Sequence, residues 1–378
     1  MQVYGRSNIS EFLGERIVYR NLIPMDDRLL SLIEIRKELG LSSSVIPRKS
    51  EKDYAKVIVQ MLNQARAIEL PVLKIERLIL IGDTRLNDGR AFENICQAGD
   101  WPGIAFIGAE TDGPLNIEIV QVTNNQRLFL ANRWSALSEF DRYCNDEGFP
   151  IDEQTAIILD LDKTTLGARG RNAHVIDQAR VQAVEDTVAT LLGTDFDKSA
   201  FEHNYSTLNH TKFHPFTTDN QDYLAYICLI LGSGLYDLES LVNEVNNGSM
   251  RTFNQFINQV DAQIDHFQSE LVSIHEEIFA YVQAGDPTPF KAFRRNEYLR
   301  TVNQMGQMDD LLPANLYLEG EIVITQEVRS TGLVWRRCGA LLFGLSDKPD
   351  EASIPSEELK KQGFLPLHQK NTHSVGSI

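Results

Sequence analysis

The chain has 378 residues, which is enough for two domains and a large core. It carries 36 Lys and Arg against 53 Asp and Glu, and its formal net charge of −17 argues against a nucleic-acid partner and against an anionic membrane surface. The four cysteines lack metal-ligand and disulfide spacing, no secretory signal is visible, and the longest apolar run, Leu224–Leu231, is too short to span a membrane, so we expect a cytoplasmic protein.

The first informative segment is a lysine before a predicted helix. Ser50–Asp53 has the weak pattern of a capping box, which predicts a helix over Glu51–Ala67. Lys49 directly precedes this pattern, and a cation beside a helix N-terminus is well placed to bind an anion. Lys52 and Lys56 lie on the predicted helix and are the alternatives in this segment.

The next segment predicts a strand, a helix and a second strand. Arg77–Gly82 is an apolar run that predicts a buried strand, and Asp83 follows it directly, with a further carboxylate at Asp88. A helical pattern covers residues 89–98, and Ile104–Ile107 predicts the second strand. The acidic residues are therefore expected at the carboxyl end of a strand, where parallel sheets hold their active sites.

The most informative motif begins at Thr155 and contains two carboxylates spaced two residues apart. Thr155–Leu159 predicts a buried strand, and Asp160 is the first residue beyond it. Side chains two positions apart leave an extended chain on the same side, so Asp162 should emerge beside Asp160. Two converging carboxylates either share a cation or have pKa values pushed apart, so that one attacks while the other moves protons.

Helical patterns dominate residues 166–320. The clearest one covers Phe253–Val282, where apolar residues recur at alternating steps of four and three, the spacing of a heptad seam. We expect a long helix that packs on other helices of the same domain, and the alternative is a coiled coil that forms a homodimer through residues 253–282. Three further helices are predicted, at Ala173–Leu192, Gln221–Leu231 and Leu235–Val245.

The Asp-x-Asp-x-Thr motif at residues 160–164 resembles the first motif of the haloacid dehalogenase-like (HAD) phosphohydrolases. Asp83 and Asp88 resemble the fourth motif, whose acidic residues hold Mg²⁺. Gly339–Leu345 predicts a strand that ends at Ser346, and this resembles the second motif, whose hydroxyl binds the transferring phosphoryl group. The motifs run fourth, first, second along this chain, which is a circular rotation of the usual order.

The resemblance implies an α/β fold with a three-layer Rossmann-like parallel sheet. This circularly permuted core would comprise residues 1–165 and 321–378, and a mostly α-helical cap domain would occupy residues 166–320. The cap's hinge is expected in Leu166–Gly170 and again near Leu316–Glu321, because glycines suit a segment that changes its dihedral angles. A hairpin is predicted from Asn116–Val122 and Arg127–Ala131, and it would be a joining element created by the permutation.

The resemblance also implies roles for the motif residues. Asp160 would be the nucleophile that forms an aspartyl-phosphate, and Asp162 would be the general acid and base. Mg²⁺ would be held by Asp160, by the backbone carbonyl of Asp162 and by Asp83, with Asp88 in support. The rotated order places the third-motif lysine at the seam, where Lys49 fits best, and Lys348 is a further alternative. The implied phosphate-binding residues are Ser346, Lys49 and Thr164, the last mainly by holding its loop.

The function implied is that of a Mg²⁺-dependent phosphatase acting on a small phosphorylated metabolite. Alternatives are a phosphoryl or acyl transferase with the same chemistry, which the lack of a reactive cysteine beside the aspartates weakens, and a non-catalytic regulatory module, against which the complete motif set argues. Lys163 departs from the family pattern, because glycine is most often found at that position. Candidate substrate contacts are four arginines, Arg169, Arg171, Arg294 and Arg295.

Overall fold

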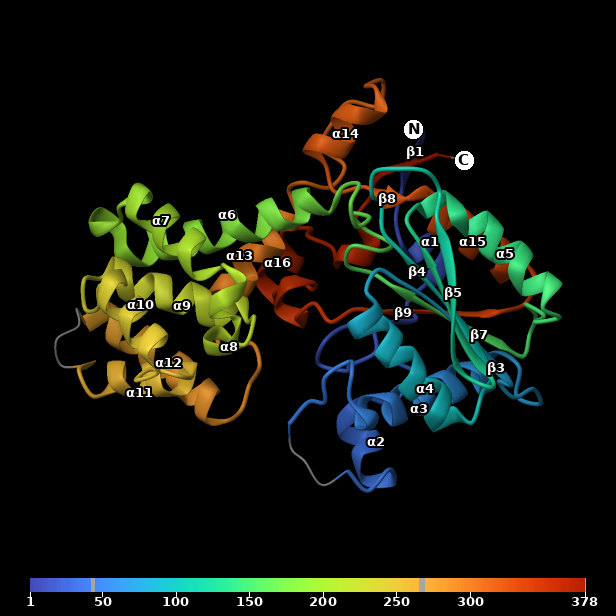
Figure 1. Cartoon of the computed structure of the whole chain (residues 1–378), viewed down its shortest axis with the longest axis horizontal. Coiled ribbons are helices and arrows are strands. Elements are labelled where there is room, and N and C mark those ends of the chain that lie inside the picture. Colours follow the sequence, from blue (N-terminus) through green and yellow to red (C-terminus); the bar gives the residue numbers. More distant parts are fainter. Residues whose placement is uncertain (42–44, 265–268, 378) are drawn as a thin grey trace. The chain divides into compact units, whose positions relative to one another are not determined.

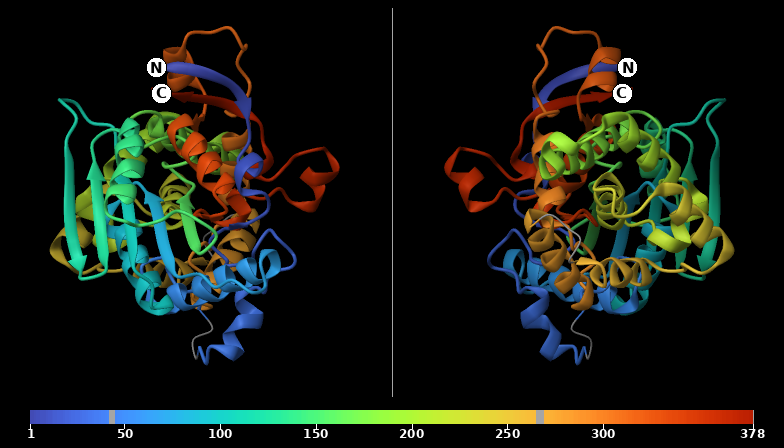
Figure 2. Two further views of the ribbon diagram at one scale, coloured as in Figure 1. Left: turned by 90° about the vertical axis from the view of Figure 1, so that its right-hand side faces the viewer. Right: turned by 90° about the vertical axis from the view of Figure 1, so that its left-hand side faces the viewer.

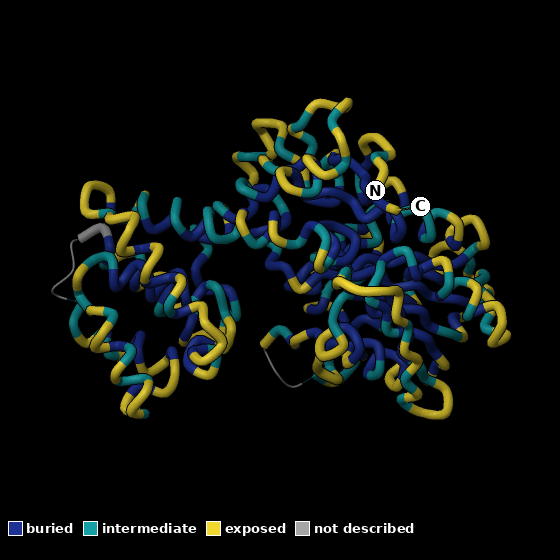
Figure 3. The backbone as a smooth tube through the Cα atoms, turned by 45° about the horizontal axis from the view of Figure 1, so that its top comes forward, coloured by how far each residue is buried: buried dark blue, intermediate teal, exposed yellow. Residues whose placement is uncertain are grey.

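The computed structural model describes residues 1–41, 45–264 and 269–377. The chain forms two compact units (Figure 1). The sheet unit comprises Met1–Gln178 and Thr301–Ile378, and the helical unit comprises Ala179–Arg300. In each unit, buried residues gather in the interior and exposed residues lie mainly on loops and outer helix faces (Figure 3).

Seven strands form the central sheet of the sheet unit. Every neighbouring pair is parallel except the outermost pair β5–β6, so the α/β class and the mostly parallel sheet predicted from the sequence are confirmed. In spatial order the strands are β2 (Ile17–Val18), β9 (Leu341–Leu345), β7 (Thr155–Asp160), β3 (Arg77–Gly82), β4 (Gly103–Gly108), β6 (Gln126–Ala131) and β5 (Ile117–Thr123).

The central strands are continuous apolar runs because both faces of the sheet are covered by helices. Side chains alternate between the faces, so that Leu78 and Ile158 pack with one helical layer, while Phe106 contacts Phe140 on the other side. The sheet unit therefore has three layers (Figure 2). One layer contains α3 (Lys52–Glu69) and α4 (Arg90–Gly99), and the other contains α1 (Ser10–Leu13), α5 (Leu137–Asp146) and α15 (Gln326–Arg337).

A second, three-stranded sheet brings the two ends of the chain together. Strand β1 (Gln2–Ser7) is antiparallel to β10 (Thr372–Gly376), which is parallel to β8 (Ile324–Thr325). This sheet was not predicted from the sequence, since β1 and β10 are too polar to form apolar runs and β8 has only two residues. Three short helices complete the unit, namely α2 (Leu32–Glu38), α14 (Ala314–Gly320) and α16 (Glu357–Lys361).

The helical unit is built around its own apolar core, to which α9 contributes an almost continuously buried stretch, Leu224–Leu231. No helix in the described part of the chain is long and apolar enough to cross a membrane. The helices are α6 (Ala173–Leu192), α7 (Lys198–Leu208), α8 (His214–Thr217), α9 (Gln221–Gly232), α10 (Leu238–Asn247), α11 (Phe253–Asp261), α12 (Ser269–Gln283) and α13 (Lys291–Val302).

The long helix predicted over Phe253–Val282 is wrong, because α11 ends at Asp261 and Ala262 caps it. Phe253, Val260 and Ile278 are nevertheless buried in the core of the helical unit, as expected for packing within one domain. The coiled-coil homodimer over residues 253–282 therefore lacks the continuous helix that it requires. Phe267, another apolar residue of the predicted heptad pattern, lies outside the described part of the chain.

The boundaries of the units differ from the predicted insert, residues 166–320. The chain after β7 stays with the sheet unit, because the backbone N–H of Gly167 donates to Val323 O at 2.9 Å and Leu166 bridges Ile324. Gly167 and Gly170 do adopt positive φ, +63° and +75°, but a Cβ at either position would collide with packed neighbours. This segment is therefore a packed turn inside the sheet unit, and the unit boundaries fall within α6 and α13.

Candidate functional site

Three polar motifs meet at one edge of the central sheet. Strand β7 lies between β3 and β9, and all three run parallel, so their carboxyl ends lie side by side. Asp160 is the last residue of β7 and pairs in register with Leu345, the residue before Ser346. Asp83 directly follows β3. These residues therefore lie at strand ends as predicted, although Asp160 is the last residue of its strand and not the first one beyond it.

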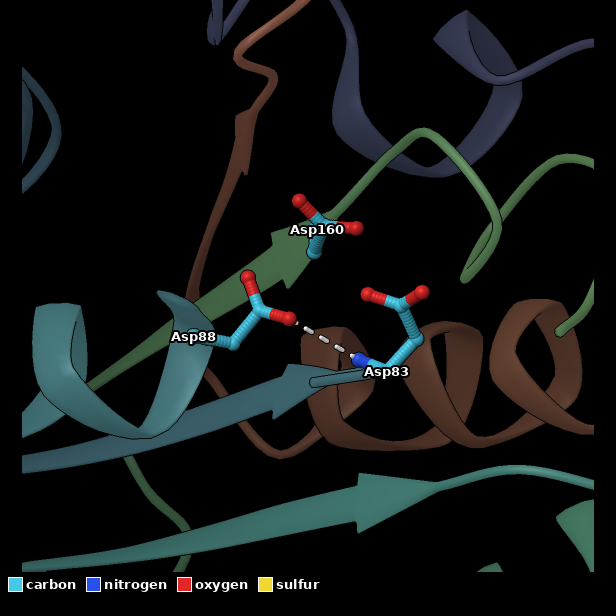
Figure 4. A group of neighbouring side chains, drawn as sticks. All are labelled: Asp83, Asp88 and Asp160. Carbon is cyan, nitrogen blue, oxygen red and sulfur yellow. Dashed lines mark hydrogen bonds between the residues drawn. The ribbon is translucent and has the colours of Figure 1, made fainter. Parts of the chain in front are cut away.

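Asp83, Asp88 and Asp160 form a carboxylate cluster (Figure 4). One oxygen of each lies within 4.8 Å of the others, although Asp88 is far from Asp160 in sequence. The π-helical turn Arg85–Gly89 returns Asp88 to the strand end, where its Oδ2 accepts hydrogen bonds from the backbone N–H groups of Asp83 at 3.1 Å and Thr84 at 2.8 Å. The turn explains why a glycine precedes Asp83.

A side chain at that glycine, Gly82, would place its Cβ 2.5 Å from the Cβ of Asp88, closer than two such carbons approach. Asp88 can therefore pack against the strand only if residue 82 lacks a side chain. Because Asp83 directly follows the same strand, the Gly-Asp pair in the sequence encodes both the first carboxylate and the space for the second. Asp88 itself is buried, with 2 % of its surface exposed.

Lys49 is the cation of this cluster. Its Nζ lies 2.6 Å from Asp88 Oδ1 and 2.5 Å from Asp160 Oδ1, and its side chain is 4 % exposed. The rival lysines, Lys52 and Lys56, are both exposed, and Lys56 pairs with Asp53 on the helix surface. Lys49, the preferred candidate, therefore lies at the predicted strand ends, whereas the predicted capping box does not form.

Helix α3 begins at Lys52, and its N-cap is Glu51, whose side chain makes no capping hydrogen bond. Ser50 instead belongs to the turn that leads into the helix, and its carbonyl accepts a hydrogen bond from Asn94 Nδ2 at 2.8 Å. This contact ties the turn carrying Lys49 to α4. The lysine is thus positioned by neighbouring packing and does not depend on a side-chain cap.

The ionisation of the cluster follows from burial and from two cations, Lys49 and Arg169, the second of which forms an ion pair with Asp83. Burial and the charge of Asp88 raise the pKa of Asp83 to about 7, against the effect of Arg169. Burial would also raise the pKa of Asp88, but Lys49 and hydrogen bonds bring it down to about 2. Burial raises the pKa of Asp160 above its ordinary value, and the charge of Lys49 opposes this rise.

The loop after β7 has a strained residue, Lys163, at the position where the sequence differs from the motif that it resembles. Lys163 has φ +65°, in the left-handed region that glycine adopts without steric cost. Its Nζ pairs with Asp177 Oδ1 at 2.7 Å. The hydroxyl of Thr165 donates to the carbonyl of Asp160 at 2.7 Å and holds the loop. Thr164 is fully buried, and within the described structure its Oγ1 has no hydrogen-bond partner.

Asp162, which was predicted to emerge beside Asp160, is not a member of the three-carboxylate cluster found among the described residues. It lines a small cavity together with Ser346 and Lys348. The Oγ of Ser346 accepts a hydrogen bond from the backbone N–H of Lys348 at 3.1 Å, and its own N–H donates to Val18 O at 3.0 Å. Sequence analysis placed Ser346 at a strand end, and the structure adds that β2 holds it. Lys348 is buried beside this serine rather than in the cluster that contains Lys49.

The other arginines considered as substrate contacts have different environments. Arg171 is buried and makes a two-point ion pair with Glu327, at 2.9 Å for both contacts, which leaves it no exposed binding group. Arg294 is buried against Asp222 in the helical unit. Arg295 is exposed. Arg171 and Arg294 therefore form structural ion pairs and are not placed to contact a substrate as predicted. Arg169 belongs to the carboxylate cluster through its ion pair with Asp83.

Comparison with protein-family models, curated proteins and solved structures finds no match to this chain. The chemistry of the site follows from its donor atoms. Three carboxylates that bring oxygens within 4.8 Å suit a hard divalent cation, for which oxygen ligands are preferred. Lys49 and Arg169 supply two positive charges against three carboxylates, so a bound cation would change the local charge from negative to positive. Such a site can then attract a phosphate.

Proposed function

We propose that this protein is a HAD-like, Mg²⁺-dependent phosphohydrolase that acts on a small phosphorylated substrate through an aspartyl-phosphate at Asp160. The observation that carries the proposal is the convergence of Lys49, Asp83, Asp88 and Asp160 from three separate segments of the chain. Lys49 pairs with two carboxylates at once, and Asp83 adds a third, so the cluster holds more negative charge than its two cations, Lys49 and Arg169, compensate. The cluster also lies where parallel sheets hold their ligands.

The arrangement of the chain supports the rotated motif order. The strand that carries the first motif, β7, has the strands of the fourth and second motifs as its two neighbours. The segment before the fourth motif and the segment after the second motif also lie side by side, because β1 pairs with β10. The helical unit is inserted between the first and second motifs, so the proposal includes a role for it as the cap.

In the proposed reaction, Asp160 attacks phosphorus and the leaving oxygen receives a proton from Asp162. Lys49 favours the ionised, nucleophilic form of Asp160, against the effect of burial. Ser346 and Lys49 would bind oxygens of the phosphoryl group. The three carboxylates would hold Mg²⁺, and the backbone carbonyl of Asp162 is the further ligand predicted from the sequence. The ion would reduce the repulsion between the nucleophile and the phosphate.

The proposal is tested by hydrolysis of para-nitrophenyl phosphate with Mg²⁺ and with excess EDTA. Asp160→Asn should lower turnover at least about a thousandfold, because the nucleophile is lost while the shape of the side chain is kept. Asp100→Asn is the matched control, since Asp100 caps α4 with φ +54°, a conformation that asparagine also accepts. Metal-independent turnover, or residual activity in Asp160→Asn above about a thousandth of wild type, would contradict the assignment.

Binding of beryllium fluoride gives a second readout that does not depend on the choice of substrate. Wild-type protein should bind it in the presence of Mg²⁺, whereas Asp160→Asn should not, because the fluoride complex needs the carboxylate of the nucleophile. If neither protein hydrolyses para-nitrophenyl phosphate and neither binds beryllium fluoride, the site does not handle phosphoryl groups. The alternative of a non-catalytic module would then be favoured.

A further inference from the structure

The cavity that Asp162 lines has a volume of about 20 Å³. A cavity of roughly 10–15 Å³ on this scale admits one water molecule, so this one has room for about one water and little more. Its polar lining comes from Asp162, Ser346 and Lys348, and aliphatic side chains such as Ile9 and Leu367 form much of the remaining wall. It therefore combines groups that can bind water with apolar walls that leave little room for a larger molecule.

Tyr19 also lines this cavity, and a buried histidine holds its hydroxyl group. Its Oη lies 3.0 Å from Nδ1 of His368, and Nε2 of His368 lies 3.0 Å from Glu15 Oε2. Tyr19 is 2 % exposed and His368 is fully buried, whereas Glu15 reaches the surface and is held by the side-chain amide of Gln369 at 3.0 Å. The three side chains thus form a linear chain of hydrogen bonds that ends at the cavity.

The direction of these hydrogen bonds can be derived. Burial lowers the pKa of His368, against the effect of Glu15, so the ring is neutral near pH 7. A carboxylate only accepts hydrogen bonds, so Nε2 of His368 carries the proton and its Nδ1 is the acceptor. Tyr19 therefore donates its hydroxyl proton to His368. A hydroxyl oxygen that donates one hydrogen bond can also accept others.

We propose that this cavity holds the water molecule that hydrolyses the aspartyl-phosphate, and that Tyr19 is a positioning residue for that water. The inference rests on the proposed function. In the step, the water oxygen bonds to phosphorus while the bond between phosphorus and the Asp160 oxygen breaks. Asp160 leaves as a carboxylate, one water proton passes to Asp162, and the other stays on the phosphate oxygen after being oriented toward Tyr19 Oη. Asp162 keeps its proton for the next leaving group.

The size of the cavity also decides between hydrolysis and transfer. An alcohol that accepted the phosphoryl group would have to place at least one carbon in a space that water fills, against the side chains of Ile9, Leu161, Leu166 and Leu367. The phosphoryl group should therefore pass to water even when an alcohol is abundant. This selects the hydrolase over the transferase on the basis of shape.

The first test uses wild-type protein, para-nitrophenyl phosphate and Mg²⁺ with added methanol. Inorganic phosphate and para-nitrophenol should be released in equal amounts, whereas Leu367→Ala should release less phosphate than para-nitrophenol because methyl phosphate forms in the enlarged cavity. Formation of methyl phosphate by the wild-type protein would overturn the proposal. Wild-type protein that shows neither turnover nor beryllium fluoride binding would instead contradict the proposed function.

The second test is Tyr19→Phe. The phosphoenzyme trapped by acid quenching should decay at least about tenfold more slowly than in wild type, because one orienting hydrogen bond is lost, while beryllium fluoride binding stays unchanged. Tyr226→Phe is the matched control, since Tyr226 Oη makes an equivalent buried contact with His275 Nδ1, at 2.6 Å, within the helical unit. Wild-type decay in Tyr19→Phe, or equal slowing in both variants, would show that Tyr19 does not orient the water.

Discussion

Lys49→Met removes one charge from the centre of the carboxylate cluster while keeping most of the apolar stem. Lys49 Nζ contacts Asp88 at 2.6 Å and Asp160 at 2.5 Å, and the three side chains are at most 7 % exposed. Loss of one partner from a buried ion pair costs about 3–5 kcal/mol, because the remaining charge is left without compensation. Here two carboxylates lose their cation together. We therefore expect metal-free Lys49→Met to be destabilised by at least about 3 kcal/mol at pH 8.

The assay is thermal unfolding in EDTA at pH 8 and at pH 5. A loss of that size should lower the midpoint by at least about 6 °C, at roughly 2 °C or more per kcal/mol for a unit of this size. Lys49 favours the ionised forms of Asp88 and Asp160, so the loss should be larger at pH 8 and smaller at pH 5, where protonation begins to replace the missing cation. Mg²⁺ should restore part of the stability if it binds the same carboxylates.

Lys56→Met is the control for this prediction. Lys56 pairs with Asp53 across one turn of α3, and their side chains are 48 % and 45 % exposed, so the loss should be below about 1 kcal/mol. The reasoning is refuted if Lys49→Met stays within about 1 kcal/mol of wild type at pH 8, or if its loss is independent of pH. It is also refuted if the two variants lose the same stability.

Two further predictions concern the same edge of the sheet. In EDTA, the free energy of unfolding should fall as pH rises from about 4 to about 7, because the pKa of Asp83 is about 7 in the folded protein whereas unfolded aspartate titrates near 4. Urea unfolding of Asp83→Asn across this range should show a smaller decrease of the free energy of unfolding with pH. Lys163→Gly should raise the free energy of unfolding by about 1 kcal/mol, because glycine adopts the left-handed φ of 65° without strain and the lost ion pair with Asp177 is partly exposed. Lys163→Ala loses the same ion pair but keeps the backbone strain, so it should be less stable than wild type.

Local patterns predicted the elements that carry the candidate site. The strands at Arg77–Gly82 and Thr155–Leu159 and the helix Ala173–Leu192 occur where the sequence indicates them. They were predictable because a strand buried on both faces must be a continuous apolar run, and a polar residue marks its end. The heptad pattern over Phe253–Val282 led to a wrong prediction of one long helix. The spacing of apolar residues indicates which residues are buried, but it does not show whether the helix between them is continuous.

The three-stranded sheet at the chain ends could not be predicted from such patterns. Strand β10 contains Thr372, His373 and Ser374, all fully buried, which no rule based on apolar runs would assign to a core. These residues are buried because partners distant in sequence satisfy them; His373 Nδ1, for example, lies 2.8 Å from Glu321 Oε1. A polar side chain can be buried only where it has a hydrogen-bond partner, and a short stretch of sequence does not show a partner that lies far away in the chain.

From the sequence alone it could be predicted that two acidic motifs and a serine follow apolar strands, and that the accompanying cation is one of a few lysines. Only the structure shows that these strands are neighbours. Tertiary structure decided that Lys49 is that cation and that Arg171 and Arg294 are tied up in buried ion pairs. It alone placed Tyr19 beside Asp162. The physical reason is that strand ends and turns are encoded by adjacent residues, whereas charge compensation and cavity shape arise from contacts between segments far apart in the chain.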